Sequence, residues 1–309
     1  MFVAKNAWAE LRRHPWRTAL MVIASLLVTM WSVFGAAVMH EYHAAHGEGY
    51  EALKPQAVVR MTDTALSDRN GDDADWTKRY ITWNEYNVLG AAAQAKHVQF
   101  DYSVVASVPV RSTDSFKAIT TSATSGASQN ETGGDFTLTS FYNEAAVNAN
   151  EYGTFKVVEG NKLNYQDVTA RDVLISQELA KKNNLKVGST ITVGNPANAK
   201  TTYTFTVGGI YTYTDTPQGV QGADAQFAKD NRDNVIYTSY YDFAASGLDT
   251  TEGTGWAVPD INIVFTLANP QAYEQFKSAL KPDLPEGFAV SSPTIDAYNH
   301  SLEPLDKLA

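Results

Sequence analysis

The sequence predicts an α+β protein with one N-terminal transmembrane helix, followed by a two-lobed mixed α/β ectodomain that contains a β-rich inserted lobe. Three observations predict it. Residues 18–39 form an uncharged apolar run, strand-like and helix-like segments alternate at both ends of the remaining chain, and its middle is rich in β-branched and aromatic residues. A 44% hydrophobic and 19% charged composition over 309 residues excludes wholesale disorder and suffices for sizeable cores.

The apolar run 18–39 (TALMVIASLLVTMWSVFGAAVM) is long enough to cross a bilayer. As a helix it reaches roughly 33 Å, against a hydrocarbon layer of about 30 Å. A cleaved signal peptide is the alternative, because Gly35-Ala36-Ala37 supplies small residues. The run exceeds the roughly 7–15 apolar residues of a signal peptide, so we predict a retained helix.

The charge difference between the two sides of this helix predicts its orientation. Residues 1–17 carry a net charge of +3, and residues 40–309 carry −13. Positive flanks stay in the cytoplasm, so we expect a protein of the cell (inner, cytoplasmic) membrane with a cytoplasmic N-terminus and an extracytoplasmic ectodomain. The overall charge of −10 argues against a nucleic-acid partner, and the absence of cysteine excludes disulfides and thiol catalysis.

The cytoplasmic segment 1–17 is basic and amphipathic, with Val3, Ala7, Trp8 and Leu11 on one helical face. It is predicted to lie along the inner membrane surface against lipid. The plainer alternative is a short basic flank that only sets topology. Residues 40–53, beyond the membrane helix, are predicted to be a membrane-proximal stalk.

Local patterns predict the ectodomain's elements in order. A capping box of Thr82 and Glu85 opens a helix over 82–95, Ser176 caps a helix over 177–184, and Asn269-Pro270 opens a helix over 271–281. The Ser/Thr/Gly-rich stretch 121–135 is predicted to be a mobile loop. Strands are predicted at Gln56–Met61, Tyr102–Arg111, Phe116–Thr121, Asp172–Ile175, Asn234–Thr238, Ile261–Leu267 and Phe288–Ser291, with two further β-rich runs at 185–193 and 203–214.

The arrangement of these elements predicts the domain organisation. Residues 54–110 and 258–293 should form a membrane-proximal α/β lobe into which a β-rich lobe, 111–257, is inserted. Residues 294–309 have helical spacing and are predicted to be a return helix toward a missing second transmembrane helix. The hydrophobic and turn framework of the inserted lobe is predicted to consist of Val158, Gly160, Leu174, Ile175, Leu179, Val187, Gly188 and Ile210.

Candidate chemical sites are weak in this sequence. His40, His43 and His46 recur every third residue and are weak candidates for a metal site, the plainer alternative being a polar exit from the membrane. Residues 68–75 (DRNGDDAD) miss the EF-hand pattern and suit a solvated acidic loop better. No GxxxxGK[ST] phosphate cradle and no nucleophile–base motif is present, so we predict no catalytic residue and no cofactor in this chain.

Residues 155–212 carry motifs of a known family: VVEG, DVLISQELAKK, LKVGSTITV and FTVGGIY. With the basic start KNAWAELRRHPWRTALMVIASLL, the run NVIYTSYYDF and the later INIVFTLANPQAYEQFKSALK, this region resembles the extracytoplasmic core domain of MacB/FtsX-like ABC transporter permeases. The similarity extends over nearly the whole chain, in order.

The resemblance implies a permease subunit that works with a cytoplasmic ABC ATP-binding subunit and with a second permease copy or paralogue. ATP would bind the partner subunit. The ectodomain would bind or move an exported substrate such as a peptide, antibiotic or lipoprotein. Members of this family continue into further membrane helices, so we expect residues 1–309 to be an N-terminal fragment. The alternatives are a membrane-anchored regulatory ectodomain, for example FtsX-like control of a cell-wall hydrolase, and, less in keeping with the missing motifs, an anchored enzyme.

Overall fold

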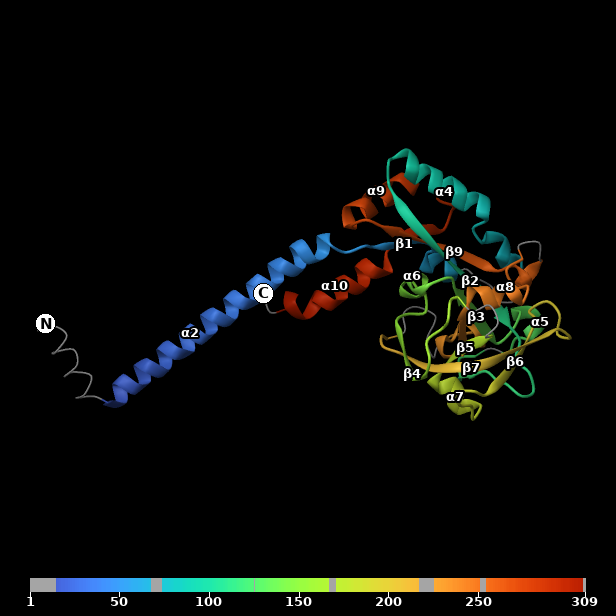
Figure 1. The fold of residues 1–309 in the computed structure, drawn as a ribbon, viewed down its shortest axis with the longest axis horizontal. Coiled ribbons are helices and arrows are strands. Elements are labelled where there is room, and N and C mark those ends of the chain that lie inside the picture. The colour runs from blue at the N-terminus through green and yellow to red at the C-terminus, as the bar shows by residue number, and fades with distance from the viewer. Residues whose placement is uncertain are drawn as a thin grey trace, which may run out of the picture. The chain divides into compact units, whose positions relative to one another are not determined.

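A computed structural model of the chain describes residues 15–67, 74–124, 126–166, 171–216, 225–250 and 254–307. The chain folds into two compact units. The helical unit comprises residues 1–53 and 296–309, and the ectodomain comprises residues 54–295. Figure 1 shows the elements of each unit along the chain.

The helical unit is built on α2 (Pro15–Ala44), which continues as a π-helical turn, η1 (Ala45–Gly49). Residues 19–49 are long and apolar enough to cross a membrane, and side chains such as Leu26 and Trp31 are exposed within the unit. These side chains need an apolar solvent, so the predicted membrane helix is confirmed in length and character. The predicted amphipathic segment lies mostly outside the described residues and stays a prediction.

A helix, α10 (Pro293–Asp306), is found within the predicted range 294–309, and its role as a return helix toward a second transmembrane helix stays a prediction. Within the helical unit, the Tyr298 hydroxyl donates a 2.7 Å hydrogen bond to the Ala45 carbonyl, which also accepts from the Tyr50 N–H at the end of the π-helical turn. A Cβ at Gly49 would lie 2.7 Å from that hydroxyl, so the glycine lets the two segments approach.

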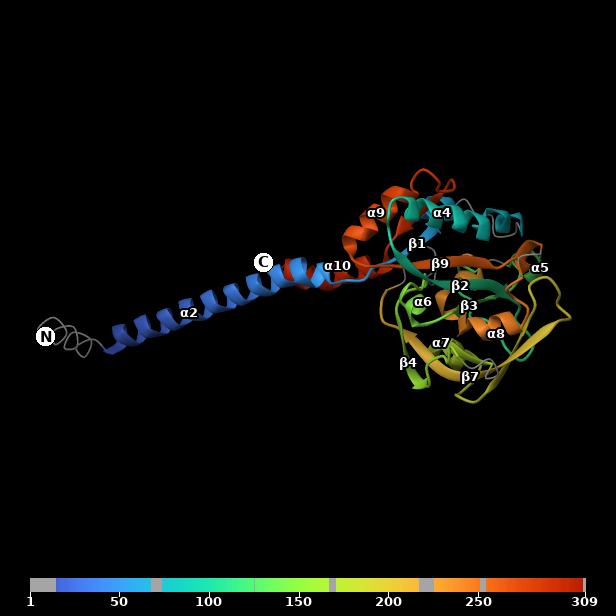
Figure 2. The same cartoon turned by 45° about the horizontal axis from the view of Figure 1, so that its top comes forward.

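The ectodomain is organised around one ten-stranded mixed sheet with the order β10-β1-β9-β2-β3-β8-β5-β7-β4 and with β6 paired to β7 (Figures 1 and 2). The strands are β1 (Gln56–Met61), β2 (Phe100–Val110), β3 (Phe136–Phe141), β4 (Phe155–Gly160), β5 (Asp172–Ser176), β6 (Thr190–Gly194), β7 (Thr202–Tyr213), β8 (Val235–Ser239), β9 (Asp260–Leu267) and β10 (Phe288–Ser291). The described helices are α3 (Asp63–Ser67), η2 (Ala74–Arg79), α4 (Trp83–Ala95), α5 (Gln129–Thr132), α6 (Glu144–Asn148), α7 (Gln177–Lys182), η4 (Ala228–Asp230), η5 (Arg232–Asn234), α8 (Tyr240–Ala245), η6 (Gly255–Ala257) and α9 (Pro270–Leu280).

At one end of the sheet, β10, β1, β9 and β2 are antiparallel, and α4 and α9 lie side by side on one of their faces (Figures 1 and 2). The aromatic rings of Phe100, Phe265 and Phe276 pack between these helices and the strands, with centroids 4.9–6.1 Å apart. Both helices begin at the predicted caps, Thr82 with its complete capping box and Asn269. This end of the sheet is therefore a helix-covered α/β layer.

Beyond β2 the sheet closes on itself. Arg111, just after β2, and Gly194, at the end of β6, exchange two backbone hydrogen bonds of 2.8 and 2.9 Å. Strands β2, β3, β8, β5, β7 and β6 thus form a closed ring, in which β3 pairs with β8 and β5 with β7 in parallel. The closure rests on this residue pair, and the Thr113 hydroxyl also donates a 2.9 Å hydrogen bond to the Thr192 carbonyl of β6.

The double glycine in β7 marks the point where this strand changes partners. Residues before Gly208 pair with β6, and residues from Gly209 onward pair with β4. A Cβ at Gly209 would lie 2.5 Å from the Asn161 carbonyl, and one at Gly160, where φ is +81°, would lie 2.3 Å from the Gly208 carbonyl. Only glycines allow these backbones to approach so closely.

Two local predictions are wrong. Phe116–Thr121 is not a strand, because two asparagine side chains take the place of a neighbouring strand: Asn183 bonds both the N–H and the C=O of Lys117, and Asn234 does the same for Ile119. Within 121–135, predicted to be a loop, Ser128 and Glu131 form a capping box that opens the short helix α5. Strands β3 and β4 and helices α3, α6 and α8 were not predicted.

The predicted boundary between the two lobes falls inside the continuous sheet. Residues 100–107 of β2 pair with β9, and residues 105–110 pair with β3, so β2 belongs to the α/β layer and to the ring. The described residues of 54–295 form one compact unit on this sheet. The division into lobes 54–110 with 258–293 and 111–257 stays a prediction.

Candidate functional site

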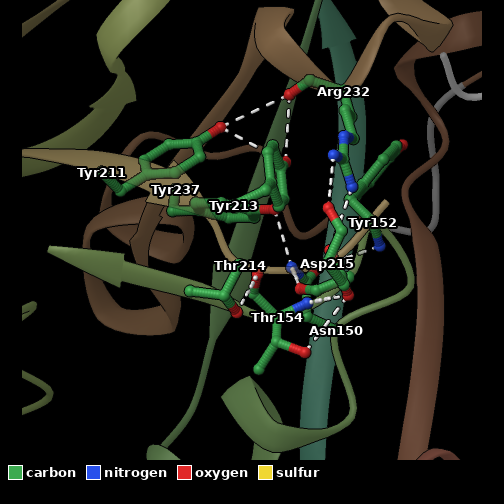
Figure 3. Close-up of polar contacts among 10 residues, drawn as sticks. Asn150, Tyr152, Thr154, Tyr211, Tyr213, Thr214, Asp215, Arg232 and Tyr237 are labelled. Atoms are coloured by element: carbon green, nitrogen blue, oxygen red, sulfur yellow. Dashed lines mark hydrogen bonds and ion pairs between the residues drawn. The ribbon is translucent and has the colours of Figure 1, made fainter. Parts of the chain in front are cut away.

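Three tyrosines from β7 and β8, the two strands on either side of β5, form the polar centre of the ectodomain. Tyr211 and Tyr213 lie two residues apart on β7, so both side chains leave the same face of that strand, and Tyr237 lies on β8. Their rings pack 4.9–5.3 Å apart with Phe155 stacked on Tyr237 at 4.6 Å. Figure 3 shows the hydroxyls directed toward one another and toward η5.

The donor and the acceptor of each hydrogen bond between Asn150, Tyr237, Tyr213 and Arg232 can be assigned. The Asn150 amide donates to the Tyr237 hydroxyl (2.7 Å) and to the Gly153 carbonyl (2.8 Å). Tyr237 therefore uses its own proton toward the Tyr213 oxygen, 2.8 Å away, and Tyr213 donates to the Arg232 carbonyl at 3.0 Å. Each step ends on a group that accepts, so the chain from Asn150 to Arg232 is fully satisfied.

Burial keeps all three phenols neutral. Desolvation is the largest cause that raises the pKa of Tyr211, Tyr213 and Tyr237 well above the usual value, followed by the repulsion a neighbouring phenolate would meet. At neutral pH the three side chains are therefore fixed hydrogen-bond donors.

A partly buried ion pair joins this tyrosine network to the end of β7. Arg232 Nη1 lies 3.0 Å from Asp215 Oδ1, with side-chain exposures of 11% and 38%, and the guanidinium carbon lies 4.2 Å above the Tyr213 ring. The Asp215 carboxylate also accepts from the Thr154 N–H (2.7 Å). A Cβ at Gly153 would lie 2.6 Å from that carboxylate, so Gly153 makes room for it.

A second polar cluster lies on β1 and β9. Arg60 of β1 donates through Nη2 to the Ala149 carbonyl, while its buried Nε has no hydrogen-bond partner in the described part of the chain. Burial, and then the charge of Glu151, raise the pKa of Asp260 to about 7, and Arg60 opposes this shift. Burial lowers the pKa of Arg60, and the charges of Glu151 and Asp260 act in the opposite direction.

Segment 149–152 connects the two clusters. Its first residue, Ala149, accepts from Arg60, Asn150 donates to Tyr237, and Glu151 acts electrostatically on Arg60 and Asp260. Three consecutive residues, Ala149, Asn150 and Glu151, thus contact or act on the two clusters. Among the described residues, these clusters place no nucleophile beside a general base.

Four of the eight predicted framework residues are buried. Leu174, Ile175, Leu179 and Ile210 are at most 5% exposed. Val187 is half-buried, and Gly160 and Gly188 have positive φ, +81° and +85°. The prediction is wrong for Val158, which is 45% exposed, because β4 is the last strand of the sheet and its bulge turns this side chain to solvent.

The three membrane-proximal histidines are not brought together. The ring of His46 stacks on Tyr42, with centroids 4.2 Å apart, and His43 meets the edge of the same ring. In the part of the chain that the structure describes, no three histidine or carboxylate side chains are placed to share a metal ion. Of the acidic loop 68–75, residues 68–73 lie outside the described residues.

The sequence reasoning missed the tyrosine network and the Arg60 cluster. A signal for the first was present, because the Tyr-x-Tyr pattern at 211–213 within a predicted strand places two phenols on one face. Nothing in the sequence indicated that Tyr237, Asn150 and Arg232 would meet them, since these contacts depend on strand order.

Comparison with known proteins agrees with this architecture. The family model of the MacB-like periplasmic core domain matches residues 20–283, from within α2 to just beyond α9. No curated protein matches the chain at a significant level.

Proposed function

The chain belongs to the family of the MacB-like periplasmic core domain, and from this membership we propose that it works as a permease subunit of an ABC transporter. The family is one of transporter components and implies assembly with an ATP-binding subunit. The proposal also includes the orientation in the membrane, the site of ATP hydrolysis and the class of substrate. The N-terminus would lie in the cytoplasm, ATP would be hydrolysed on a separate subunit, and the ectodomain would bind or move an exported peptide, antibiotic or lipoprotein.

The observation that carries the proposal is the extent of the family match, which runs from residue 20 inside the apolar helix across the ectodomain to residue 283. Membrane helix and periplasmic domain are thus matched as one arrangement. The acidic charge of residues 40–309, −13, suits a cationic substrate.

The register of the sheet supports a mechanical role for the two connections to the helical unit. The start of β1 pairs with the end of β10, at Val58 and Ser291. The Gln56 N–H donates a 2.8 Å hydrogen bond to the hydroxyl of Thr294, at the start of α10. The chain therefore enters and leaves the ectodomain from two hydrogen-bonded strands at one end. Movement of either connection would exert force on both strands and, through Arg60, on segment 149–152.

A native mass measurement on the complex extracted from its own membranes tests this proposal. We expect the chain to co-purify with an ATP-binding protein in a defined ratio, and addition of a detergent that strips the complex should release that subunit. Recovery of the chain with a wall hydrolase and without any ATP-binding protein would instead support an anchored regulatory ectodomain. Recovery with neither would overturn the permease proposal.

A further inference from the structure

A small cavity of about 190 Å³ lies at one end of the ring, away from the tyrosine network. It is partly open to solvent and lies where the end of β2, the extended segment 116–124, the turn after α5 and the start of η4 meet, and Ala118, Ala127, Phe227 and Ala228 form its apolar walls. Four hydroxyl side chains, one carboxylate and one ammonium line it: Ser112, Thr120, Thr124, Thr132, Asp135 and Lys117. Pockets for drug-sized ligands measure roughly 300–1,000 Å³, so this cavity has room for one side chain or one sugar ring.

The carboxylate of Asp135 is fixed in place. The Ser112 hydroxyl donates to Asp135 Oδ2 at 2.6 Å and accepts from the Gln129 amide at 2.9 Å, which gives the hydroxyl a single direction. The Asp135 N–H donates to the Val110 carbonyl at 3.1 Å. The side chain is half-buried, and no described residue donates to Oδ1.

The turn that carries Asp135 is held in place by close packing. Gly133 has φ +79°, and a Cβ there would lie 2.6 Å from the Trp256 side chain; a Cβ at Gly134 would lie 2.1 Å from the Val110 carbonyl. Beneath the turn, the ammonium group of the buried Lys229 donates a 2.6 Å hydrogen bond to the Thr132 carbonyl. The same group lies 3.4 Å from the centre of the Trp256 ring. The carboxylate therefore sits on a rigid support.

We propose that this cavity binds the ammonium group of a lysine side chain presented by a basic peptide. An ammonium has three donors, and the Oδ1 of Asp135 and the hydroxyl oxygen of Thr120 can accept from it; the Thr124 oxygen already accepts from the Thr121 N–H at 2.9 Å. A wholly apolar ligand would leave the carboxylate and hydroxyls desolvated without a partner, whereas a lysine also offers a methylene stem to the apolar walls at Ala118 and Phe227. The net charge of −13 beyond the membrane helix attracts a basic peptide.

Lys117, at the rim, opposes the ligand. Its ammonium is exposed and lies 3.3 Å from the exposed carboxylate of Asp114, so this pair is well screened. The site thus makes opposite predictions for two of its charged residues. Loss of the Asp135 charge should weaken binding, and loss of the Lys117 charge should strengthen it.

Calorimetric titration of the full chain in detergent tests the site, with Nα-acetyl-lysine amide as the probe and Nα-acetyl-norleucine amide as its uncharged counterpart. We expect the lysine probe alone to bind, with a dissociation constant in the millimolar range. Asp135→Asn keeps the Ser112 hydrogen bond and should weaken binding at least tenfold, and Lys117→Gln should strengthen it two- to fivefold. Asp101→Asn, an exposed carboxylate on β2, is the matched control and should change nothing.

Equal binding of both probes, or unchanged binding by Asp135→Asn, would overturn the proposal, as would binding of glucose in place of the lysine probe. Thr120→Phe provides a second variant, because Thr120 is exposed and a ring there fills the mouth without disturbing the core. It should abolish binding while the melting temperature stays the same. These readouts measure binding alone, so failure of the site and failure of the permease proposal are separate results.

Discussion

The side-chain amide of Asn150 donates a 2.7 Å hydrogen bond to the hydroxyl of Tyr237, 87 residues further along the chain. Both groups are buried, at 8% and 0% exposure. This contact links the segment held by Arg60 of β1 to the hydroxyl chain between β7 and β8. It is the point where the two polar clusters of the ectodomain meet.

Removal of the Tyr237 hydroxyl should therefore destabilise the ectodomain. Tyr237→Phe leaves the Asn150 amide short of one acceptor and the Tyr213 oxygen without its donor, at a cost of about 1–3 kcal/mol in the free energy of unfolding. Tyr102→Phe, at a phenol that is 67% exposed, is the control and should cost little. Chemical denaturation of both variants measures the difference; equal stabilities would contradict the buried network.

Alkaline titration should separate the buried tyrosines from the exposed ones. The folded-state pKa values of Tyr211, Tyr213 and Tyr237 are raised, so their contribution to stability is complete below about pH 10 and is lost as the pH rises further. We expect tyrosine absorbance to show an early phase from exposed phenols and a late phase that coincides with unfolding. A single early phase for every tyrosine would disprove the arrangement.

Asp260 should make stability pH-dependent in the acidic range. Its folded pKa, about 7, lies above the unfolded value of about 3.9, so the fold binds this proton more tightly. Its contribution is complete below about pH 4 and is lost as the pH rises toward 7, by about 2–4 kcal/mol. Asp260→Asn should flatten the stability profile between about pH 4 and 7, whereas Asp114→Asn, at an exposed carboxylate, should retain the wild-type slope. Identical slopes in all three proteins would refute the shift.

Replacement by alanine should lower the stability of the fold by different amounts at two framework glycines. Gly160 and Gly188 both have positive φ, but a Cβ at Gly160 would lie 2.3 Å from the Gly208 carbonyl, and one at Gly188 would meet nothing within 4 Å. Gly188→Ala should cost about 1 kcal/mol from backbone strain alone. Gly160→Ala should cost clearly more, because β4 and β7 must separate. Thermal unfolding of the two variants provides the comparison, and equal losses would show that the close approach is unimportant.

Ile175 offers the most severe test of the core. It is fully buried on β5, so Ile175→Asp places an unpaired charge in the interior and should prevent cooperative folding, at a cost of several kcal/mol. Val158→Asp, on the exposed side of β4, introduces the same charge with little expected effect. A wild-type melting curve for Ile175→Asp would mean that Ile175 is not in the core.

Local sequence patterns predicted much of the secondary structure, because caps and strand residues act over short distances. Thr82, Ser176 and Asn269 each accept the backbone hydrogen bond that opens a helix where it was expected. Phe116–Thr121 failed, since its pattern of alternating residues suits a strand but its hydrogen-bond partners are the side chains of Asn183 and Asn234. Those partners lie 66 and 115 residues away and leave no local signal.

The candidate sites depended even more on long-range pairing. The position of Tyr237 beside Tyr213 follows from β5 lying between β8 and β7, and the Asp135 cavity follows from the meeting of four separate segments. Neither Asp135 nor Arg60 differs in its sequence surroundings from an ordinary surface charge.

The sequence by itself determined the membrane helix, the family, most strands and the helix caps, because hydrophobic runs, charge asymmetry and caps are properties of contiguous residues. Only the tertiary structure decided that the β-rich segment closes into a ring through Arg111 and Gly194, that Val158 faces solvent, and that Asn150 meets Tyr237. These outcomes depend on which strands become neighbours and in which register. Strand order is selected by the burial of the whole sheet, and no single segment specifies it.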